Sequence, residues 1–188
     1  ADRLARTAGI LTSPGEFWIK HVIDSLYIFR YFPELAKTRF KVADIGAGAG
    51  FPSIVLASAF PDLHITAVES SHKKTDFIRR TAELLKLRNI RIETVRAREM
   101  AARKEWKLKF DIITARAVST CMELYAETRP MLRHDGRFIF YKTPRQAETE
   151  LCEIRRLSAT HAGIKWDVTS AFSLPLNMGE RLFIYSHR

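Results

Sequence analysis

Three glycines alternate with alanines in the segment Asp44-Ile45-Gly46-Ala47-Gly48-Ala49-Gly50-Phe51-Pro52, directly after a short apolar run. Glycines at alternate positions let the backbone turn tightly and approach a ligand without a Cβ in between. Open α/β sheets bind ligands beyond the carboxyl ends of their strands, and this segment falls at such an end. The pattern predicts a ligand-binding loop; the alternative is a turn that serves chain geometry alone.

The spacing of the glycines narrows the class of ligand. A dinucleotide-binding loop, G-x-G-x-x-G, would place its third glycine at position 51, which is Phe51. A Walker-type phosphate loop needs Gly-Lys followed by Ser or Thr, and that sequence is absent. The observed spacing resembles the first motif of class I methyltransferases, in which the loop lies beneath the methionine part of S-adenosylmethionine. The predicted cofactor contacts in this segment are Asp44, Gly46, Gly48, Gly50 and Phe51.

Two further strand ends fall near the same predicted edge. Glu69 closes the predicted strand 64–69, where a carboxylate can accept hydrogen bonds from both ribose hydroxyls. A dehydrogenase also places an acid there, so Glu69 does not separate the two enzyme classes, and a solvated acid remains the alternative. The third strand ends before Ala97 and Arg98, whose backbone groups we expect beside the adenine ring.

The elements that position these residues alternate between strands and helices. Ser13 and Glu16 form a capping box for a helix that we expect to run to about Tyr31. The apolar runs predict strands at 41–45, 64–69, 90–95, 110–114, 137–142, 166–173 and 181–186, and helices at 51–60, 72–87, 120–132 and from Thr143 to about Gly163. This order predicts an α/β fold with a mostly parallel sheet covered on both faces. The resemblance to class I methyltransferases implies their Rossmann-like three-layer sandwich, with a seven-stranded sheet and an antiparallel last strand.

Length and composition limit the organisation of the chain. Its 188 residues predict one domain, 1–188, with an N-terminal helical segment at 1–35 and a Rossmann-like core at 40–188. Cys121 and Cys152 lack ligand-like spacing, so no metal site or disulfide framework is expected. No signal peptide is visible and no stretch can span a membrane, which predicts a cytoplasmic protein. Four aromatic residues are predicted to be in the core: Trp18, Phe29, Tyr31 and Phe60.

Positive charge is concentrated in one part of the chain. The net charge is +10, and the stretch 73–109 alone holds 13 basic and 5 acidic residues. A basic face attracts polyanions, which favours nucleic acid as a partner; solvated helix surfaces are the alternative. The predicted RNA contacts are Lys73, Lys74, Lys142 and Arg145, although a plain surface role stays open for Lys142 and Arg145.

Together these segments resemble the bacterial glucose-inhibited division protein B family (RsmG/GidB), which methylates N7 of a guanine in 16S ribosomal RNA. The resemblance covers nearly the whole chain, although the segment before the sheet is shorter and the family often has glycine at Ser53 and Thr143. The matching segments are Phe17–Leu26, Asp44–Pro52, Glu69–Lys74, Thr114–Ala117 and Gly179–Arg181.

The resemblance implies S-adenosylmethionine as cofactor and 16S rRNA or the small ribosomal subunit as substrate, with a monomeric enzyme. It implies cofactor contacts from Gly46, Phe51, Ala97, Arg98 and Arg116. Two other functions remain open: a class I methyltransferase that acts on a protein or small molecule, and a non-catalytic RNA-binding protein.

The expected chemistry needs no general base, because guanine N7 already offers a lone pair. Catalysis should come from holding N7 in line with the methyl group. Arg116 and Lys142 are the possible participants; Arg116 could hold the cofactor carboxylate or an RNA phosphate, or form a surface salt bridge. His21 and Asp24 share a helix face three residues apart and either serve function or merely bond one another.

Overall fold

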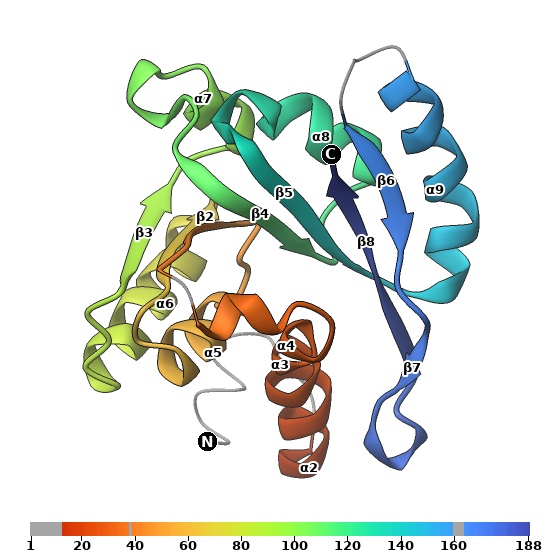
Figure 1. Cartoon of the computed structure of the whole chain (residues 1–188). Coiled ribbons are helices and arrows are strands. Elements are labelled where there is room, and N and C mark those ends of the chain that lie inside the picture. Colours follow the sequence, from red (N-terminus) through yellow and green to blue (C-terminus); the bar gives the residue numbers. More distant parts are fainter. Residues whose placement is uncertain (1–12, 38, 160–163) are drawn as a thin grey trace.

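The computed structural model describes residues 13–37, 39–159 and 164–188 (Figure 1). Its sheet has the strand order β3-β2-β1-β4-β5-β8-β6, and the short β7 pairs with β8. Strands β1 to β5 run parallel to one another, whereas β8 is antiparallel to β5, β6 and β7. The strands are β1 Lys41–Ile45, β2 His64–Glu69, β3 Ile90–Thr94, β4 Phe110–Arg116, β5 Leu132–Lys142, β6 Lys165–Val168, β7 Phe172–Ser173 and β8 Glu180–His187.

The predicted α/β fold with a mostly parallel sheet and an antiparallel last strand is confirmed. One predicted strand, 166–173, is wrong because it is divided into β6 and β7. The division follows Thr169, whose hydroxyl accepts a hydrogen bond from the Phe183 amide at 3.0 Å. A side chain thus replaces one backbone partner of the ladder, and regular pairing stops there.

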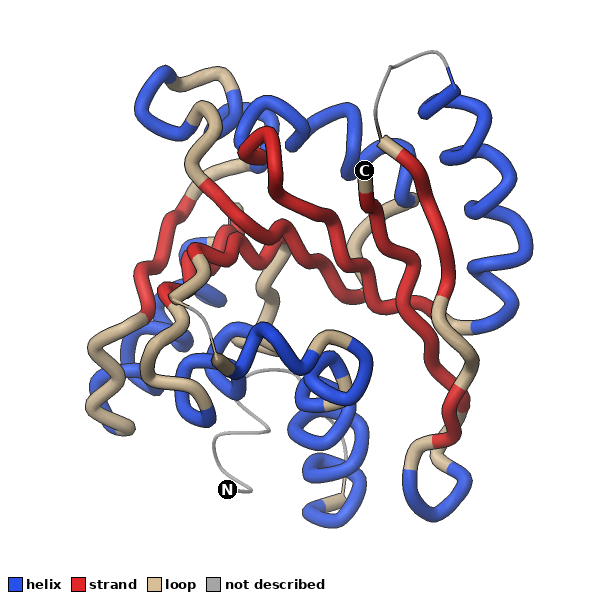
Figure 2. The backbone as a smooth tube through the Cα atoms, in the orientation of Figure 1, coloured by secondary structure: helices blue, strands red, loops and turns tan. Residues whose placement is uncertain are grey.

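Helices cover both faces of the sheet, as Figures 1 and 2 show. On one face, α7 Ala97–Ala101, α8 Cys121–Thr128 and α9 Pro144–Ala159 pack against inward side chains such as Ala43 and Ile45. On the other, α5 Ser53–Ala59, α6 His72–Leu84 and the N-terminal helices pack against side chains such as Val42. Short 3-10 turns occupy Pro33–Ala36, Lys104–Trp106, Arg129–Met131 and Pro175–Asn177. The predicted end of the last helix, near Gly163, lies outside the described residues.

The N-terminal helical run begins at the predicted capping box, in which Ser13 Oγ accepts from the Glu16 amide at 3.3 Å. It is not the single α-helix that we expected, because α2 Pro14–Phe17 is followed by a π-helix, Trp18–Ile23, and then by α3 Asp24–Leu26 and α4 Ile28–Tyr31. Side chains bond to carbonyls of the π segment: Ser25 Oγ donates to His21 O and Arg116 donates to Lys20 O. π-helical turns of this kind are frequent at functional sites.

Four aromatic residues were predicted to be in the core, and the prediction is wrong for Trp18. This residue begins the π-helix and is 57% exposed. Phe29 and Phe60 stack on one another with ring centroids 3.6 Å apart, beneath the sheet. The Tyr31 ring is tilted against those of Phe172 and Phe183, with centroids 5.5 and 5.7 Å apart. The helical run is therefore anchored to the sheet by its carboxyl-terminal half.

Candidate functional site

The glycine loop connects β1 to α5 at the carboxyl edge of the sheet. The amides of Gly46 and Ala47 donate to the Val68 carbonyl at 2.8 and 3.1 Å, which ties the loop to β2. Gly46 and Gly48 have φ angles of +66° and +57°. A Cβ on Gly46 would lie 2.5 Å from Val118, whereas a Cβ on Gly48 would meet no atom closer than 3.8 Å. Gly46 is required by packing, and Gly48 leaves bare backbone toward a cavity.

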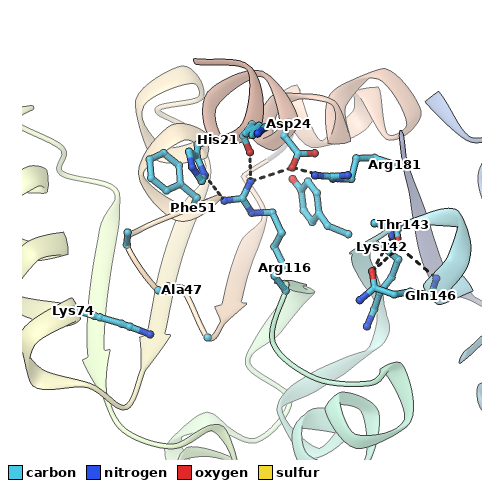
Figure 3. A pocket seen from close by; sticks show the side chains of 16 residues that line it. His21, Asp24, Ala47, Phe51, Lys74, Arg116, Lys142, Thr143, Gln146 and Arg181 are labelled. Carbon is cyan, nitrogen blue, oxygen red and sulfur yellow. Dashed lines mark hydrogen bonds and ion pairs between the residues drawn. The ribbon is translucent and has the colours of Figure 1, made fainter. Parts of the chain in front are cut away.

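Two cavities of about 480 Å³ each lie along this edge. Both are lined by Gly46, Lys74 and Ala117, so they form one continuous groove across the strand ends. We call the half near β2, β3 and α8 the cofactor side, and the half beneath the N-terminal helices the acceptor side (Figure 3). The groove thus follows the place where open α/β sheets bind ligands.

Glu69 is held rigidly on the cofactor side. Its Oε2 accepts from the Gly48 amide at 3.1 Å and its Oε1 from the Ser71 amide at 2.9 Å. A carboxylate has about four lone-pair sites, so these two bonds leave room for ribose hydroxyls. Ala97 and Arg98, at the start of α7, line the same half of the groove. The predicted roles of these three residues remain predictions, and their positions agree with them.

Asp44 and Gly50 differ from the expected direct contacts, because neither residue lines the groove. Asp44 is fully buried beneath the loop, and its Oδ2 accepts from the backbone amide (3.1 Å) and the hydroxyl of Ser53. Burial raises the pKa of Asp44 to about 6. A Cβ on Gly50 would lie 2.6 Å from Ile54, on the α5 side. Asp44 and Gly50 therefore support the loop on the side that faces α5, away from the groove.

The acceptor side is organised by one buried carboxylate. Asp24, which is 1% exposed, accepts at Oδ2 from Arg116 at 3.1 Å and from Arg181 at 3.4 Å (Figure 3). Burial raises the pKa of Asp24, and the two guanidinium groups of Arg116 and Arg181 oppose that rise. Arg116 also donates to Lys20 O at 2.9 Å. Arg116 is therefore a member of a buried network, not a surface salt bridge.

The same network fixes the tautomer of His21. Arg116 lies 3.2 Å from His21 Nδ1, and a guanidinium can only donate, so Nδ1 accepts and the ring proton resides on Nε2. Burial, followed by the charge of Arg116, lowers the pKa of His21 to about 4, which keeps the ring neutral. Its ring centroid lies 5.0 Å from that of Phe51. His21 thus presents a fixed N–H donor in the lining of the cavity.

Lys142 is not the accessible RNA contact that we expected. It is 5% exposed, and its Nζ donates to Glu150 at 2.8 and 3.0 Å and to Ser119 O at 2.7 Å. Glu150 and the Ser119 carbonyl already hold the ammonium group, so a phosphate would have to compete with them. Arg145, Lys73 and Lys74 are exposed, and their predicted contacts with RNA remain predictions.

Two members of the site received no role from the sequence. Glu150 lies on α9 and neutralises Lys142, and Arg181 lies near the start of β8. Because β8 is antiparallel to β5, its amino end reaches the edge where the parallel strands end. The sequence could have placed Arg181 in the site, because it lies near the start of an antiparallel last strand. No sequence feature around Glu150 indicates that it faces Lys142.

Comparisons with known proteins agree with this geometry. The family described as rRNA small subunit methyltransferase G matches residues 9–173. The ribosomal RNA small subunit methyltransferase G of Staphylococcus saprophyticus is 36% identical over 174 residues, 93% of this chain and 71% of that protein. The protein of the same description from Lacticaseibacillus paracasei is 39% identical over 133 residues, 70% of this chain but 55% of that protein. The match thus spans little more than half of the latter relative.

Solved structures show the fold. A SAM-dependent methyltransferase from Aquifex aeolicus superposes with a TM-score of 0.64 at 15% identity, over 97% of this chain and 98% of that one. TYW2 of M. jannaschii in complex with AdoMet gives a TM-score of 0.63 at 18% identity, over 96% and 78% of the two chains. The fold is that of the class I SAM methyltransferases, and the chain belongs to the rRNA small subunit methyltransferase G family.

Proposed function

We propose that this chain transfers a methyl group from S-adenosylmethionine to N7 of a guanine in 16S ribosomal RNA. The observation that carries the proposal is the continuous groove, in which bare backbone at Gly48 joins a cavity lined by Arg116 and Arg181. One half suits a nucleoside and the other an anionic acceptor. Membership of the family supports the same substrate class.

The residues of the cofactor side fit S-adenosylmethionine. Gly46, which lines both halves, and Gly48, which lines the adjoining end of the acceptor side, would hold its methionine part against backbone. Glu69 would accept from its ribose hydroxyls, and Ala97 and Arg98 would border the adenine. When bound, the cofactor supplies an electrophilic methyl group on a sulfonium. Nothing in this half has to ionise or move a proton for that purpose.

On the acceptor side, the chain positions the base. Arg116 and Arg181 carry two positive charges against the one negative charge of Asp24, which favours a nearby phosphate. The Nε2–H of His21 can donate to guanine O6, the acceptor beside N7. Adenine presents an amino donor at that position, so a fixed donor in the protein would select against it. Alignment of N7 with the methyl group then supplies the rate acceleration.

The proposal includes a monomer that works in the cytoplasm. A single chain supplies both the backbone of the cofactor side and the charged side chains of the acceptor side. Both cysteines, Cys121 and Cys152, are free thiols, which fits a reducing compartment. No helix within the described residues is long and apolar enough to cross a membrane.

The test is to incubate the protein and radiolabelled S-adenosylmethionine with small ribosomal subunits from cells that lack this activity. We expect label in 16S rRNA, at a guanine that becomes sensitive to N7-methyl-specific cleavage. Cofactor binding without transfer to RNA would favour a protein or small-molecule acceptor. RNA binding without cofactor affinity would favour a non-catalytic role.

A further inference from the structure

A second concave surface lies at the opposite edge of the sheet, at the amino ends of β1, β2, β3 and β4. This cavity of about 240 Å³, which we call the amino-end groove, has no carboxylate among its lining residues. Its basic and imidazole side chains are Lys41, His64, Arg88, Arg91 and Lys109. With strands of five to six residues and about 3.3 Å per residue, it lies roughly 17–20 Å from the glycine loop.

The amino-end groove has a rigid frame. The Asn89 side-chain amide lies 3.0 to 3.1 Å from three carbonyl oxygens, of Ala57, Phe60 and Leu63, and so fixes the loop before β3. The Arg91 guanidinium lies 4.7 Å from the ring centroid of the buried Trp106. A cation over an aromatic face is oriented without losing its charge. The Arg91 guanidinium is thus oriented before any ligand binds.

The carboxylates near the groove are already engaged. Glu93 pairs with Arg91, Asp62 pairs with Arg39 at 3.5 Å, and Asp111 pairs with Arg133 at 3.1 Å. Within the described part of the chain, the side chains of Lys41, Arg88 and Lys109 form no ion pair. Three uncompensated cations therefore face one small concave surface, and the ligand that this charge favours is an anion.

The edge strand β3 connects the two grooves. Arg88 and Arg91 lie at its amino end, whereas Arg96 and Arg98 follow its carboxyl end and line the cofactor side of the catalytic groove. Exposed cations also occur on the segments that flank this edge, at Lys86, Arg103, Lys104 and Lys107. A single compact anion would use only one end of this arrangement, whereas an extended polyanion can follow the whole edge.

We propose that the amino-end groove binds the sugar–phosphate backbone of the substrate RNA, at a second site distant from the methylated base. The inference rests on the proposed function, because it identifies the polyanion as that RNA. Phosphate contacts position a nucleic acid without reading its sequence. The second site fixes the register of the RNA on the enzyme, and the catalytic groove selects the base.

The test removes two charges from the groove with R88Q/K109Q. The matched control, R156Q/K165Q, removes two exposed charges from α9 and β6 at the other edge of the sheet. The probe is a fluorescent 16S rRNA fragment, titrated at several salt concentrations. We expect R88Q/K109Q to bind about tenfold more weakly at physiological salt and to lower the salt slope by about 1.4, the value for two single-strand phosphate contacts. The control should bind like the unmodified protein, and all three should bind S-adenosylmethionine equally.

Two results would overturn the inference: equal losses in the two variants, or an unchanged affinity and salt slope in R88Q/K109Q. Inorganic tripolyphosphate is the second probe. If R88Q/K109Q loses binding of tripolyphosphate but not of RNA, the groove holds a small anion and the inference is wrong. Methyl transfer to small subunits is measured separately. Absence of transfer by the unmodified protein, with the groove-dependent salt slope intact, would reject the proposed reaction and leave the second RNA site standing.

Discussion

The two halves of the catalytic groove are built from different parts of the chain. The cofactor side consists mainly of backbone from three consecutive strand ends, held by local bonds such as Gly48 N to Glu69. The acceptor side consists of charged side chains from distant segments that converge on Asp24. A site made of backbone tolerates substitutions unless the new side chain fills the space of the ligand. A network of charged side chains is disrupted when any one of its members is replaced. The predictions below test this difference.

The largest effect should follow Asp24→Asn. Loss of the buried carboxylate leaves the partly buried Arg116 and Arg181 without their shared counter-charge, which costs about 3–5 kcal/mol of unfolding free energy. Equilibrium unfolding in guanidinium chloride measures this loss of unfolding free energy. The control is Asp76→Asn, which breaks an exposed pair with Arg79 and should cost less than about 1 kcal/mol. Similar losses in both variants would mean that the acceptor side is not organised by Asp24.

Asp44 should give the next largest effect, as a pH dependence. Its folded pKa of about 6 exceeds the unfolded value of 3.8, so the folded state binds the proton more tightly. The resulting stability is fully present below pH 3.8 and is lost as the pH rises through 6, by about 3 kcal/mol. The facing groups are Ser53, Arg116 and Glu69. Unfolding at pH 4 and pH 7 should show this loss in the unmodified protein and not in Asp44→Asn; parallel curves would contradict it.

Gly48→Val should block the cofactor where the two halves of the groove meet, while the fold persists. The new side chain enters the open space over the loop, and we expect S-adenosylmethionine affinity to fall at least about 100-fold, or about 2.7 kcal/mol. The left-handed backbone adds a stability loss of about 1–2 kcal/mol. Calorimetric titration measures the affinity. Gly15→Val, at another open position outside the groove, is the control, and an equal affinity in both variants would remove the loop from the site.

The smallest effect should come from His21→Phe, which keeps the ring contact with Phe51 but removes the donor. We expect kcat/KM on ribosomal subunits to fall about tenfold, or about 1.4 kcal/mol, with cofactor affinity unchanged. His21→Gln restores a donor and should recover part of the loss. Since the pKa of His21 is about 4, its titration should leave no step in the activity between pH 6 and 8. Equal activity of all three proteins would exclude a donor role.

The two halves also differ in how far the sequence predicts them. The glycine loop, Glu69 and the start of α7 follow strand ends, so periodicity and spacing place them correctly. The same reasoning placed Asp44 in the groove, although its side chain points under the loop to Ser53. The position of a strand end predicts at which edge of the sheet a residue lies. It does not predict whether the side chain of that residue points into the groove or beneath the loop.

The acceptor side could not be predicted in this way, because its geometry depends on pairings between distant segments. Lys142 looks like a surface cation until Glu150 is known to face it from the next helix. His21 and Asp24 share a helix face, yet they are joined through Arg116 and not directly. Local patterns show the residue types and leave the partners undetermined. The spacing of apolar residues also did not distinguish the π-helical segment that carries His21 from an ordinary α-helix.

The bonds from Asp24 reach across 92 residues to Arg116 and across 157 residues to Arg181. Contacts between residues so far apart in the chain form slowly, whereas the residues that line the cofactor side all lie between positions 45 and 127. The acceptor side, in contrast, is lined by residues from Lys20 to Arg181, so it is complete only when β8 has joined the sheet. A chain that ended before β8 would therefore keep every residue that lines the cofactor side and would lack Arg181 of the acceptor side.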